Sequence, residues 1–239
     1  NGVITSPQQE QRSMYGHGFA TMFLAQVYGM EEDPVLQLEL HRVLTKAVEL
    51  IVRAQSSYGG WYYSPDSGMD EGSVTVTQLQ ALRACRNAGI AVPAKCVERA
   101  VQYIAKSKNP DGGIRYGARS GGSSRPAITA AALAALYNAG DYSSDKIPPL
   151  WNYAKQNLHN LGGRSYGHWH YTYLYYSQVV YRQGANEWKP FRDKIAKRLV
   201  SEQLPGGDWK GASVGGIYTT AVNLIILQLD NGYLPIYQR

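Results

Sequence analysis

The sequence lacks any long apolar run and any recognisable leader. No stretch approaches the roughly 20 apolar residues that a membrane-spanning helix needs, so we expect no transmembrane segment. The chain opens on a polar stretch at Asn1 and has no initiating Met. This start predicts a soluble mature form, such as a secreted or periplasmic protein, or a truncated one. The localisation is otherwise left open.

Cysteine is also scarce, with Cys85 and Cys96 alone. They flank a predicted turn at 87–89, so an antiparallel helix pair would bring them near each other. A disulfide requires Cβ atoms within about 4.5 Å. Two buried free thiols are the simpler expectation, because a free Cys behaves as a small hydrophobic residue.

Charge of either sign is sparse, at 18% of the residues, with a net charge of +6. This excess favours acidic partners only slightly. The densest basic group lies on one predicted helix. Its members are Lys189, Arg192, Lys194, Lys197 and Arg198. A charge run on a single helix is usually a solvated face, so we expect no nucleic-acid partner.

The sequence does contain an internal repeat. The pattern Gln-x3-Gly-x-Trp at 55–61 recurs 148 positions later at 203–209, with eroded copies at 108–114 and 158–164. The four glycines of these copies are 53, 50 and 45 residues apart. Such a period marks a repeat protein. We expect each repeat to bury its apolar face by stacking on its neighbours.

The repeat units are predicted to be pairs of helices. Stretches before the glycine turns place apolar residues at helical spacing and charge on the other face, whereas stretches after the turns are rich in small uncharged residues. Outer helices are therefore predicted at 36–52, 94–107, 146–158 and 187–202. Inner helices are predicted to begin near residues 17, 73, 127, 170 and 217.

This alternation predicts an all-α fold, an α/α toroid of about five to six helical hairpins. A single domain over residues 1–239 accommodates them. A ring of six pairs needs more helices than the sequence supplies, including an outer helix before Met14. We therefore expect the domain to be truncated at its N-terminus.

The repeated turn resembles the motif of squalene–hopene cyclases and their relatives in the terpenoid cyclase and protein prenyltransferase superfamily of toroids. The segments 14–21, 59–65 and 73–75 are similar to a bacterial squalene-cyclase-like group of unassigned activity. The likeness spans nearly the whole chain. It implies the toroid but no particular activity, because one fold hosts many unrelated chemistries.

The catalytic signatures of these families are missing. Hopene-type cyclases protonate their alkene with an Asp-x-Asp-Asp acid, whereas the nearest acidic cluster here, Asp66, Asp70 and Glu71, has another spacing. The Asp-Cys-Thr-Ala-Glu acid of oxidosqualene cyclases and the Asp-x-Cys zinc pair of prenyltransferases are also absent. We therefore expect neither a standard squalene–hopene cyclase nor a zinc protein prenyltransferase.

The turns that lead into the inner helices are the expected place for a site, because they open onto one end of the central funnel. The triplet Tyr15-Gly16-His17 recurs as Tyr166-Gly167-His168, and Asp70 and Glu71 precede the next inner helix. We expect both histidines and one carboxylate to face one cavity as catalytic candidates. A helix N-terminus favours a neutral imidazole. The alternative is that the histidines only form hydrogen bonds within the turns.

Zinc held by His17, His168 and a carboxylate is a weaker alternative. Such a tripod leaves an open coordination position, and lanthipeptide cyclases, another group of toroids, place zinc at the starts of inner helices. Their Cys-His-Gly signature is absent from this sequence. No cofactor is therefore expected, and zinc is kept only as an alternative.

Tyrosine is abundant, with 19 residues against 3 phenylalanines. A buried hydroxyl needs a hydrogen-bond partner, so this excess favours a semi-polar cavity over a purely apolar one. The alternative is that the tyrosines bridge helices. The ligand-binding candidates are Tyr15, His17, Trp61, Asp70, Tyr166, His168, His170, Tyr171, Tyr175 and Tyr218.

The expected function is to bind a small-molecule or glycan ligand in this cavity. One alternative is an enzyme acting on a glycan or another polar substrate, with His17, His168 and tyrosines as acid and base in the manner of a lyase. The other is a divergent terpenoid cyclase or prenyltransferase. A cyclase needs a buried protonated carboxyl in the cavity, whereas a lyase needs a Tyr/His pair near an arginine. The oligomeric state is left open.

Overall fold

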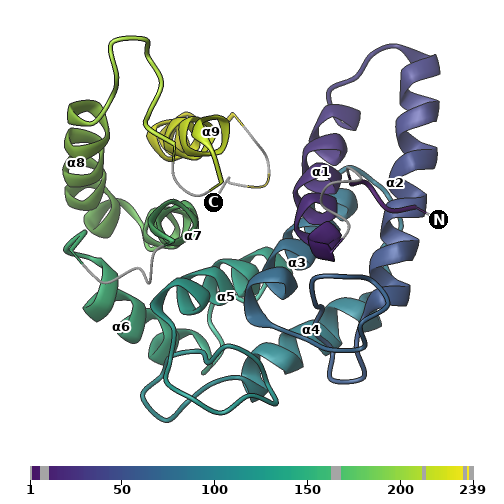
Figure 1. Cartoon of the computed structure of the whole chain (residues 1–239), viewed down its shortest axis with the longest axis horizontal. Helices are drawn as coiled ribbons and strands as arrows, with labels where there is room; N and C mark the ends of the chain where they lie inside the picture. Colours follow the sequence, from purple (N-terminus) through teal and green to yellow (C-terminus); the bar gives the residue numbers. More distant parts are fainter. Residues whose placement is uncertain (1, 6–10, 163–167, 212–213, 234–235, 237–239) are drawn as a thin grey trace.

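Helices alternate between an inner and an outer position along a curved arc (Figure 1). The computed structural model describes residues 2–5, 11–162, 168–211, 214–233 and 236. The inner helices are α1 (Ser13–Tyr28), α3 (Gly72–Asn87), α5 (Pro126–Ala139), α7 (Trp169–Arg182) and α9 (Gly216–Leu227). The outer helices are α2 (Pro34–Ala54), α4 (Ala94–Lys106), α6 (Ile147–Leu158) and α8 (Ala185–Ser201), and a short 3-10 helix, η2 (Leu229–Asn231), follows α9.

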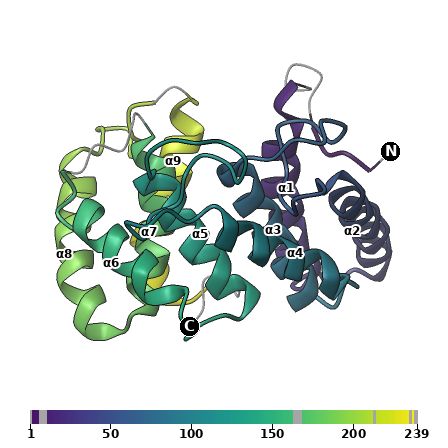
Figure 2. The same ribbon diagram turned by 90° about the horizontal axis from the view of Figure 1, so that it is seen from below.

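This arrangement confirms the predicted all-α toroid. Consecutive inner helices pack on one another, each outer helix packs on the inner helix before it, and no β-strand forms in the described ranges. The arc is open between α9 and α1 (Figure 1). Turning the view shows the loops before α3 and α5 along one edge of the arc, where α1 also begins (Figure 2). None of the helices described is long and apolar enough to cross a membrane.

Burial follows the predicted difference between inner and outer helices. On α5 all residues from Pro126 to Asn138 are buried, because other helices surround it. On α4 only one stripe is buried, at Cys96, Ala100, Tyr103 and Ile104, which is the spacing of one helix face. Both cysteines are buried and free, as the sequence favoured.

Glycine in the repeated turn allows the first two repeats to stack closely on the next. Gly59 has a φ of +98°, and a Cβ on it would lie 2.3 Å from the carbonyl O of Arg99 on α4. At Gly112 φ is +86°, and a Cβ would lie 2.6 Å from the carbonyl O of Pro149 on α6. Only glycine combines this left-handed backbone with so close an approach.

The glutamine and the tryptophan of the two full motifs close the turn by hydrogen bonds. The Gln55 side-chain amide donates to the main-chain carbonyl four residues ahead at 2.9 Å, and Gln203 does the same at 2.7 Å. The indole N–H of Trp61 donates to the carbonyl ten residues before it at 2.7 Å, as does that of Trp209. The two motifs therefore form the same turn at the ends of α2 and α8, as predicted.

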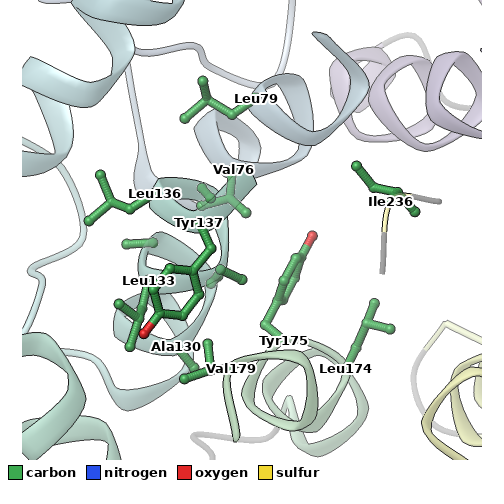
Figure 3. Packing of buried hydrophobic residues seen from close by; sticks show 14 of the residues in the cluster. Val76, Leu79, Ala130, Leu133, Leu136, Tyr137, Leu174, Tyr175, Val179 and Ile236 are labelled. Carbon is green, nitrogen blue, oxygen red and sulfur yellow. The ribbon is translucent and has the colours of Figure 1, made fainter. Parts of the chain in front are cut away.

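Side chains of α3 and α7 meet over α5 on the concave side of the arc. The Tyr171 hydroxyl of α7 donates to the main-chain carbonyl of Ser73 at 3.4 Å, and Gln80 of α3 donates to Gln178 of α7 at 3.1 Å. Figure 3 shows Tyr175 of α7 directed into the space between these helices. The three central inner helices therefore form one closely packed unit.

Candidate ligand-binding site at the N-terminal ends of the inner helices

Glu71 lies at the centre of a polar group at the start of α3. It is the N-cap residue of that helix, and its carboxylate accepts the main-chain N–H groups of Ser73 at 3.0 Å and Val74 at 2.5 Å. Acceptors are favoured here because the first N–H groups of a helix lack partners within it. The carboxylate is fully buried. A local helix-capping preference therefore places an ionisable group inside the arc.

Hydroxyl groups of two inner helices contact this carboxyl, and a third helix contributes a hydroxyl next to it. The Ser73 hydroxyl of α3 lies 2.8 Å from both carboxylate oxygens, and the Tyr15 hydroxyl of α1 lies 3.4 Å from Oε1. Tyr15 is also hydrogen-bonded to the Ser73 hydroxyl. Tyr171 of α7 donates to the Ser73 carbonyl. The group can therefore offer a ligand both hydrogen-bond donors and acceptors.

Burial determines the protonation of these groups. It raises the pKa of Glu71, although the hydrogen bonds from Val74 and Ser73 act in the opposite direction. Burial also raises the pKa of Tyr15, and the charge of Glu71 raises it further. The pKa of Tyr171 is likewise raised by burial. The tyrosines are therefore neutral donors, and Glu71 holds a proton to a higher pH than an exposed carboxyl does.

Two further tyrosines complete the predicted tyrosine cluster. The Tyr175 ring packs edge-on against that of Tyr171, with the ring centres 4.8 Å apart. Tyr218 of α9 is close enough for its charge to affect the pKa of Tyr171, and its own pKa is raised by burial to about 12. Of the predicted tyrosines, Tyr15 therefore lies beside Glu71, Tyr171 beside Ser73, and Tyr175 against Tyr171.

An aromatic rim, formed by Tyr62, Tyr63 and Tyr116, borders this group where the loops before α3 and α5 run. The Tyr63 ring lies 5.8 Å from Tyr15 and 4.4 Å from Tyr62, and its hydroxyl is hydrogen-bonded to that of Tyr116. The guanidinium of Arg12 lies 5.0 Å from the centre of the Tyr63 ring. Tyr116 is 38% exposed, so the rim reaches the surface.

Sequence reasoning missed Ser73, Tyr63 and Tyr116 as site residues. Tyr63 and Tyr116 occupy equivalent places, each two residues after the last position of a repeat motif. Their carbonyls accept the N–H of Met14 and of Gly72, at the starts of the neighbouring inner helices. Aligning the repeats on their glycines would have revealed this equivalence.

Asp70 points away from Glu71. The backbone is extended at residue 71, so adjacent side chains face opposite sides. Asp70 is buried and forms an ion pair with Arg119, with Nη2 and Oδ2 3.1 Å apart. Of the two carboxylates proposed from the sequence, Glu71 is the one beside the tyrosines.

His17 does not lie beside Glu71, contrary to the expectation. Its ring is fully buried, Nδ1 accepts the main-chain N–H of Ile4 at 3.1 Å, and Nε2 lies 3.2 Å from the carbonyl O of Ala47 on α2. Tyr15 precedes it by two positions, which on a helix is nearly the opposite face. Burial lowers the pKa of His17. The ring therefore ties the N-terminal segment and α2 to α1.

The same bond recurs in the other turns with threonine in place of histidine. In three of the motifs the last residue donates its main-chain N–H to a hydroxyl on the inner helix that follows. The pairs are Trp61 with Thr75 at 3.0 Å, Ile114 with Thr129 at 2.8 Å, and Trp209 with Thr220 at 3.2 Å. Ile4 and His17 form the equivalent pair before α1.

Among the contacts of the described residues, none joins His168 or His170 to Glu71. His168 is exposed and is the N-cap residue of α7, so it is not equivalent to His17 inside α1. The His170 ring packs against Trp169 with ring centres 5.1 Å apart, and burial lowers its pKa while Glu202 and Arg198 act on it electrostatically. Tyr166 lies outside the described residues.

Trp61, another ligand-binding candidate, holds the turn after α2 together. Its side chain is fully buried, and its indole N–H is bonded to a carbonyl of α2. The zinc alternative also loses its basis, because both ring nitrogens of His17 have protein partners. In the part of the chain that the structure describes, no group of three His, Cys, Asp or Glu side chains is placed to hold a metal ion.

Comparison with known proteins supports the fold alone. No protein-family model and no curated protein sequence matches the chain. Solved structures of the type II terpene cyclase MstE from Scytonema are similar, at 17% identity over 92% of this chain. The TM-score is 0.64 both for the free enzyme and for a variant in complex with its substrate, geranylgeranyl dihydroxybenzoate. The chain spans just under two thirds of that enzyme, 64% to 65% of its length.

Proposed function

We propose that the protein binds a small-molecule ligand on the concave side of its arc, at the N-terminal ends of α1, α3 and α7. The observation that carries the proposal is the buried carboxyl of Glu71, which hydroxyl groups of Tyr15 and Ser73 contact. A carboxyl used only as a helix cap would not need a tyrosine hydroxyl from another helix. The Tyr171 and Tyr175 rings add apolar surface, so the ligand combines an apolar body with a polar group.

The test is a binding measurement on Tyr15→Phe and Glu71→Gln variants. Native mass spectrometry of the purified protein would first reveal any molecule that copurifies. Titration calorimetry would then use geranylgeranyl dihydroxybenzoate, because the similar cyclase binds it. A hydrogen bond contributes about 1 kcal/mol, so Tyr15→Phe should weaken binding roughly fivefold.

A matched control is Tyr233→Phe, since Tyr233 is 67% exposed and removal of its hydroxyl should leave the affinity unchanged. Both Tyr15→Phe and Glu71→Gln should keep the circular dichroism spectrum of the native protein. If neither variant changes the affinity for any ligand that binds the protein, the site is not at Glu71.

A second candidate function is acid catalysis on a terpenoid by Glu71. A buried carboxyl whose pKa is raised by burial can remain protonated and give its proton to an alkene or hydroxyl. Chromatography should then show a cyclised isomer of geranylgeranyl dihydroxybenzoate that Glu71→Gln fails to form. Squalene is expected to stay unchanged because the Asp-x-Asp-Asp acid is absent, and a polycyclic product from it would contradict this expectation.

The glycan-lyase alternative receives less support. It relied on His17 and His168 as acid and base, and His17 is hydrogen-bonded in a turn while His168 is exposed at the start of α7. Its remaining support is the aromatic rim with Arg12. We therefore place ligand binding and terpenoid chemistry ahead of it.

A further inference from the structure

Arg119 belongs to the loop before α5 but binds the loop before α3. The two loops run along the same edge of the arc (Figure 2). Nη2 of Arg119 lies 3.1 Å from Oδ2 of Asp70 and donates to the carbonyl O of Gly68 at 3.4 Å. The guanidinium also lies 4.7 Å from the centre of the Tyr58 ring. One side chain of the second repeat therefore holds the segment of the first repeat that leads into α3.

Asp70 depends on this one partner. Its side chain is 1% exposed, and neither carboxylate oxygen accepts a hydrogen bond from the described residues. Arg119 is also its only ion-pair partner in that part of the chain. A buried carboxylate that loses its counter-ion is strongly unfavourable. Loss of Arg119 should therefore drive Asp70 toward water.

The position of Glu71 depends in turn on Asp70. The two residues are adjacent on an extended backbone, so their side chains face opposite sides. The main chain beside them joins two repeats, because the N–H of Glu71 donates to the carbonyl O of Trp61 at 2.9 Å and that of Gly72 donates to Tyr116 at 2.8 Å. With Asp70 anchored on one side, the Glu71 carboxyl is directed to the first N–H groups of α3 on the other.

The next repeat anchors the equivalent residue in another way. Ser124 precedes the N-cap residue of α5, as Asp70 precedes that of α3. The Ser124 hydroxyl donates to Asp111 at 2.6 Å and accepts from Asn109 at 3.0 Å, both in the turn of its own repeat. The ion pair of Asp70 with a residue of the following repeat is therefore not a general device of the repeated turn.

We propose that Arg119 is a positioning residue for the carboxyl of Glu71, on which it acts through Asp70. The positioning stands by itself, whereas its consequence for a ligand rests on the proposed function. Arg119→Gln should leave Asp70 unpaired, loosen the segment 68–71 and expose Glu71 to solvent. A site that is no longer preorganised binds less tightly, so ligand affinity should fall at least roughly fivefold.

The deciding measurement is the titration of Glu71, followed by carbon NMR of protein labelled at the glutamate carboxyl carbons. The Glu71 signal is identified by its absence from Glu71→Gln. Burial raises the pKa of Glu71 above 4.5 in the wild type, and exposure in Arg119→Gln should lower it toward that value. Loss of a positive charge alone would raise the pKa further. A fall in the pKa therefore reports displacement of the carboxyl.

Arg192→Gln is the matched control. The Arg192 side chain has the same exposed fraction as that of Arg119, 43%, and forms an ion pair with Asp230 at 2.8 Å. Its loss should change neither the titration of Glu71 nor ligand affinity. Arg119→Lys keeps a positive charge beside Asp70, so it should retain most of the raised pKa of Glu71.

An unchanged or higher pKa of Glu71 in Arg119→Gln would overturn the proposal. If that variant does not fold, Arg119→Gln combined with Asp70→Asn removes the ion pair without leaving a buried charge or altering the net charge. The pKa of Glu71 should fall in this double variant too, and an unchanged value would be equally decisive against the proposal. Failure of the proposed function would appear separately. The titration would still respond to Arg119→Gln, but Glu71→Gln would leave the affinity for every ligand unchanged.

Discussion

The main-chain N–H of Ile4 donates a hydrogen bond to Nδ1 of His17 over 3.1 Å. The other ring nitrogen lies 3.2 Å from the carbonyl O of Ala47. One imidazole therefore joins the N-terminal segment, α1 and α2. In three later turns the equivalent hydrogen bond runs from a main-chain N–H to a threonine hydroxyl. The role of His17 is therefore to fix the N-terminal segment on α1.

His17→Ala should destabilise the fold and leave ligand affinity nearly unchanged. The substitution removes two hydrogen bonds and leaves a cavity, which together cost about 2–4 kcal/mol. Chemical denaturation monitored by circular dichroism would measure the loss. His41→Ala is the matched control, because His41 is exposed on α2 and its loss should change stability by less than about 0.5 kcal/mol. A stable His17→Ala protein that no longer binds ligand would contradict this role.

Glu71 should give stability a specific dependence on pH. Burial raises its pKa above the ordinary value of 4.5, so the folded state binds the proton more tightly than the unfolded state does. The stabilisation from this tighter proton binding is complete below about pH 4.5. It is lost as the pH rises through the pKa that Glu71 has in the folded state. Relative to the wild type, Glu71→Gln should therefore gain stability as the pH rises from about 4 to 8.

Urea unfolding at several pH values would measure this difference. Glu71→Gln also weakens the helix cap, but this loss of stability is the same at every pH. The change with pH in the stability difference between variant and wild type therefore reports the carboxyl group. Asp66→Asn, at an exposed carboxyl, is the control for the loss of one negative charge. A Glu71→Gln variant that loses stability relative to the wild type as the pH rises would show that its carboxyl is stabilised as the anion.

Alanine at two equivalent glycines should have unequal costs. Both Gly59 and Gly207 have left-handed backbones, with φ of +98° and +87°, and strain there costs about 1 kcal/mol. At Gly59 a Cβ would also lie 2.3 Å from a main-chain oxygen of α4, whereas at Gly207 it would meet no atom of the described residues within 4 Å. Gly59→Ala should therefore destabilise the protein by at least about 2 kcal/mol more. Equal unfolding midpoints would show that the turns do not stack as described.

The two cysteines should resist modification until the protein unfolds. Burial raises the pKa of Cys85 to about 12 and that of Cys96 to about 11, and the thiolate is the reactive form. Titration with a thiol reagent should count no rapidly reacting thiol in the native protein and two in urea. Fast native labelling, or a disulfide found by mass spectrometry, would contradict the structure.

The helices were predictable because their signals are local. Apolar spacing marks the buried stripe of α4, and the repeated glycines mark the turns, so both follow from the sequence alone. The predicted start of α1, near residue 17, is later than the observed start at Ser13. Its N-cap residue, Arg12, makes no side-chain capping bond, so no capping signal was available.

The site was only partly predictable because it depends on helix register. Glu71 was a good candidate, since an acid before a helix caps it and its side chain then lies at the helix end. The repeated Tyr-Gly-His triplet was misleading. Its first copy lies inside α1 and its second precedes α7, so the two histidines differ in position by about one helical turn and have unrelated surroundings.

The uncovered turn at Gly207 has a consequence for the order in which the molecule opens. In a stacked array the stability of a unit is the sum of its own energy and that of its contacts with neighbours. In the described chain, α5 has neighbours on both sides and is buried almost throughout, whereas on α9 only Thr219, Val222, Asn223 and Ile226 are buried and Ile217 is 91% exposed. Amide protons of α9 should therefore exchange with solvent through local fraying, long before those of α5, which exchange only when the whole arc unfolds.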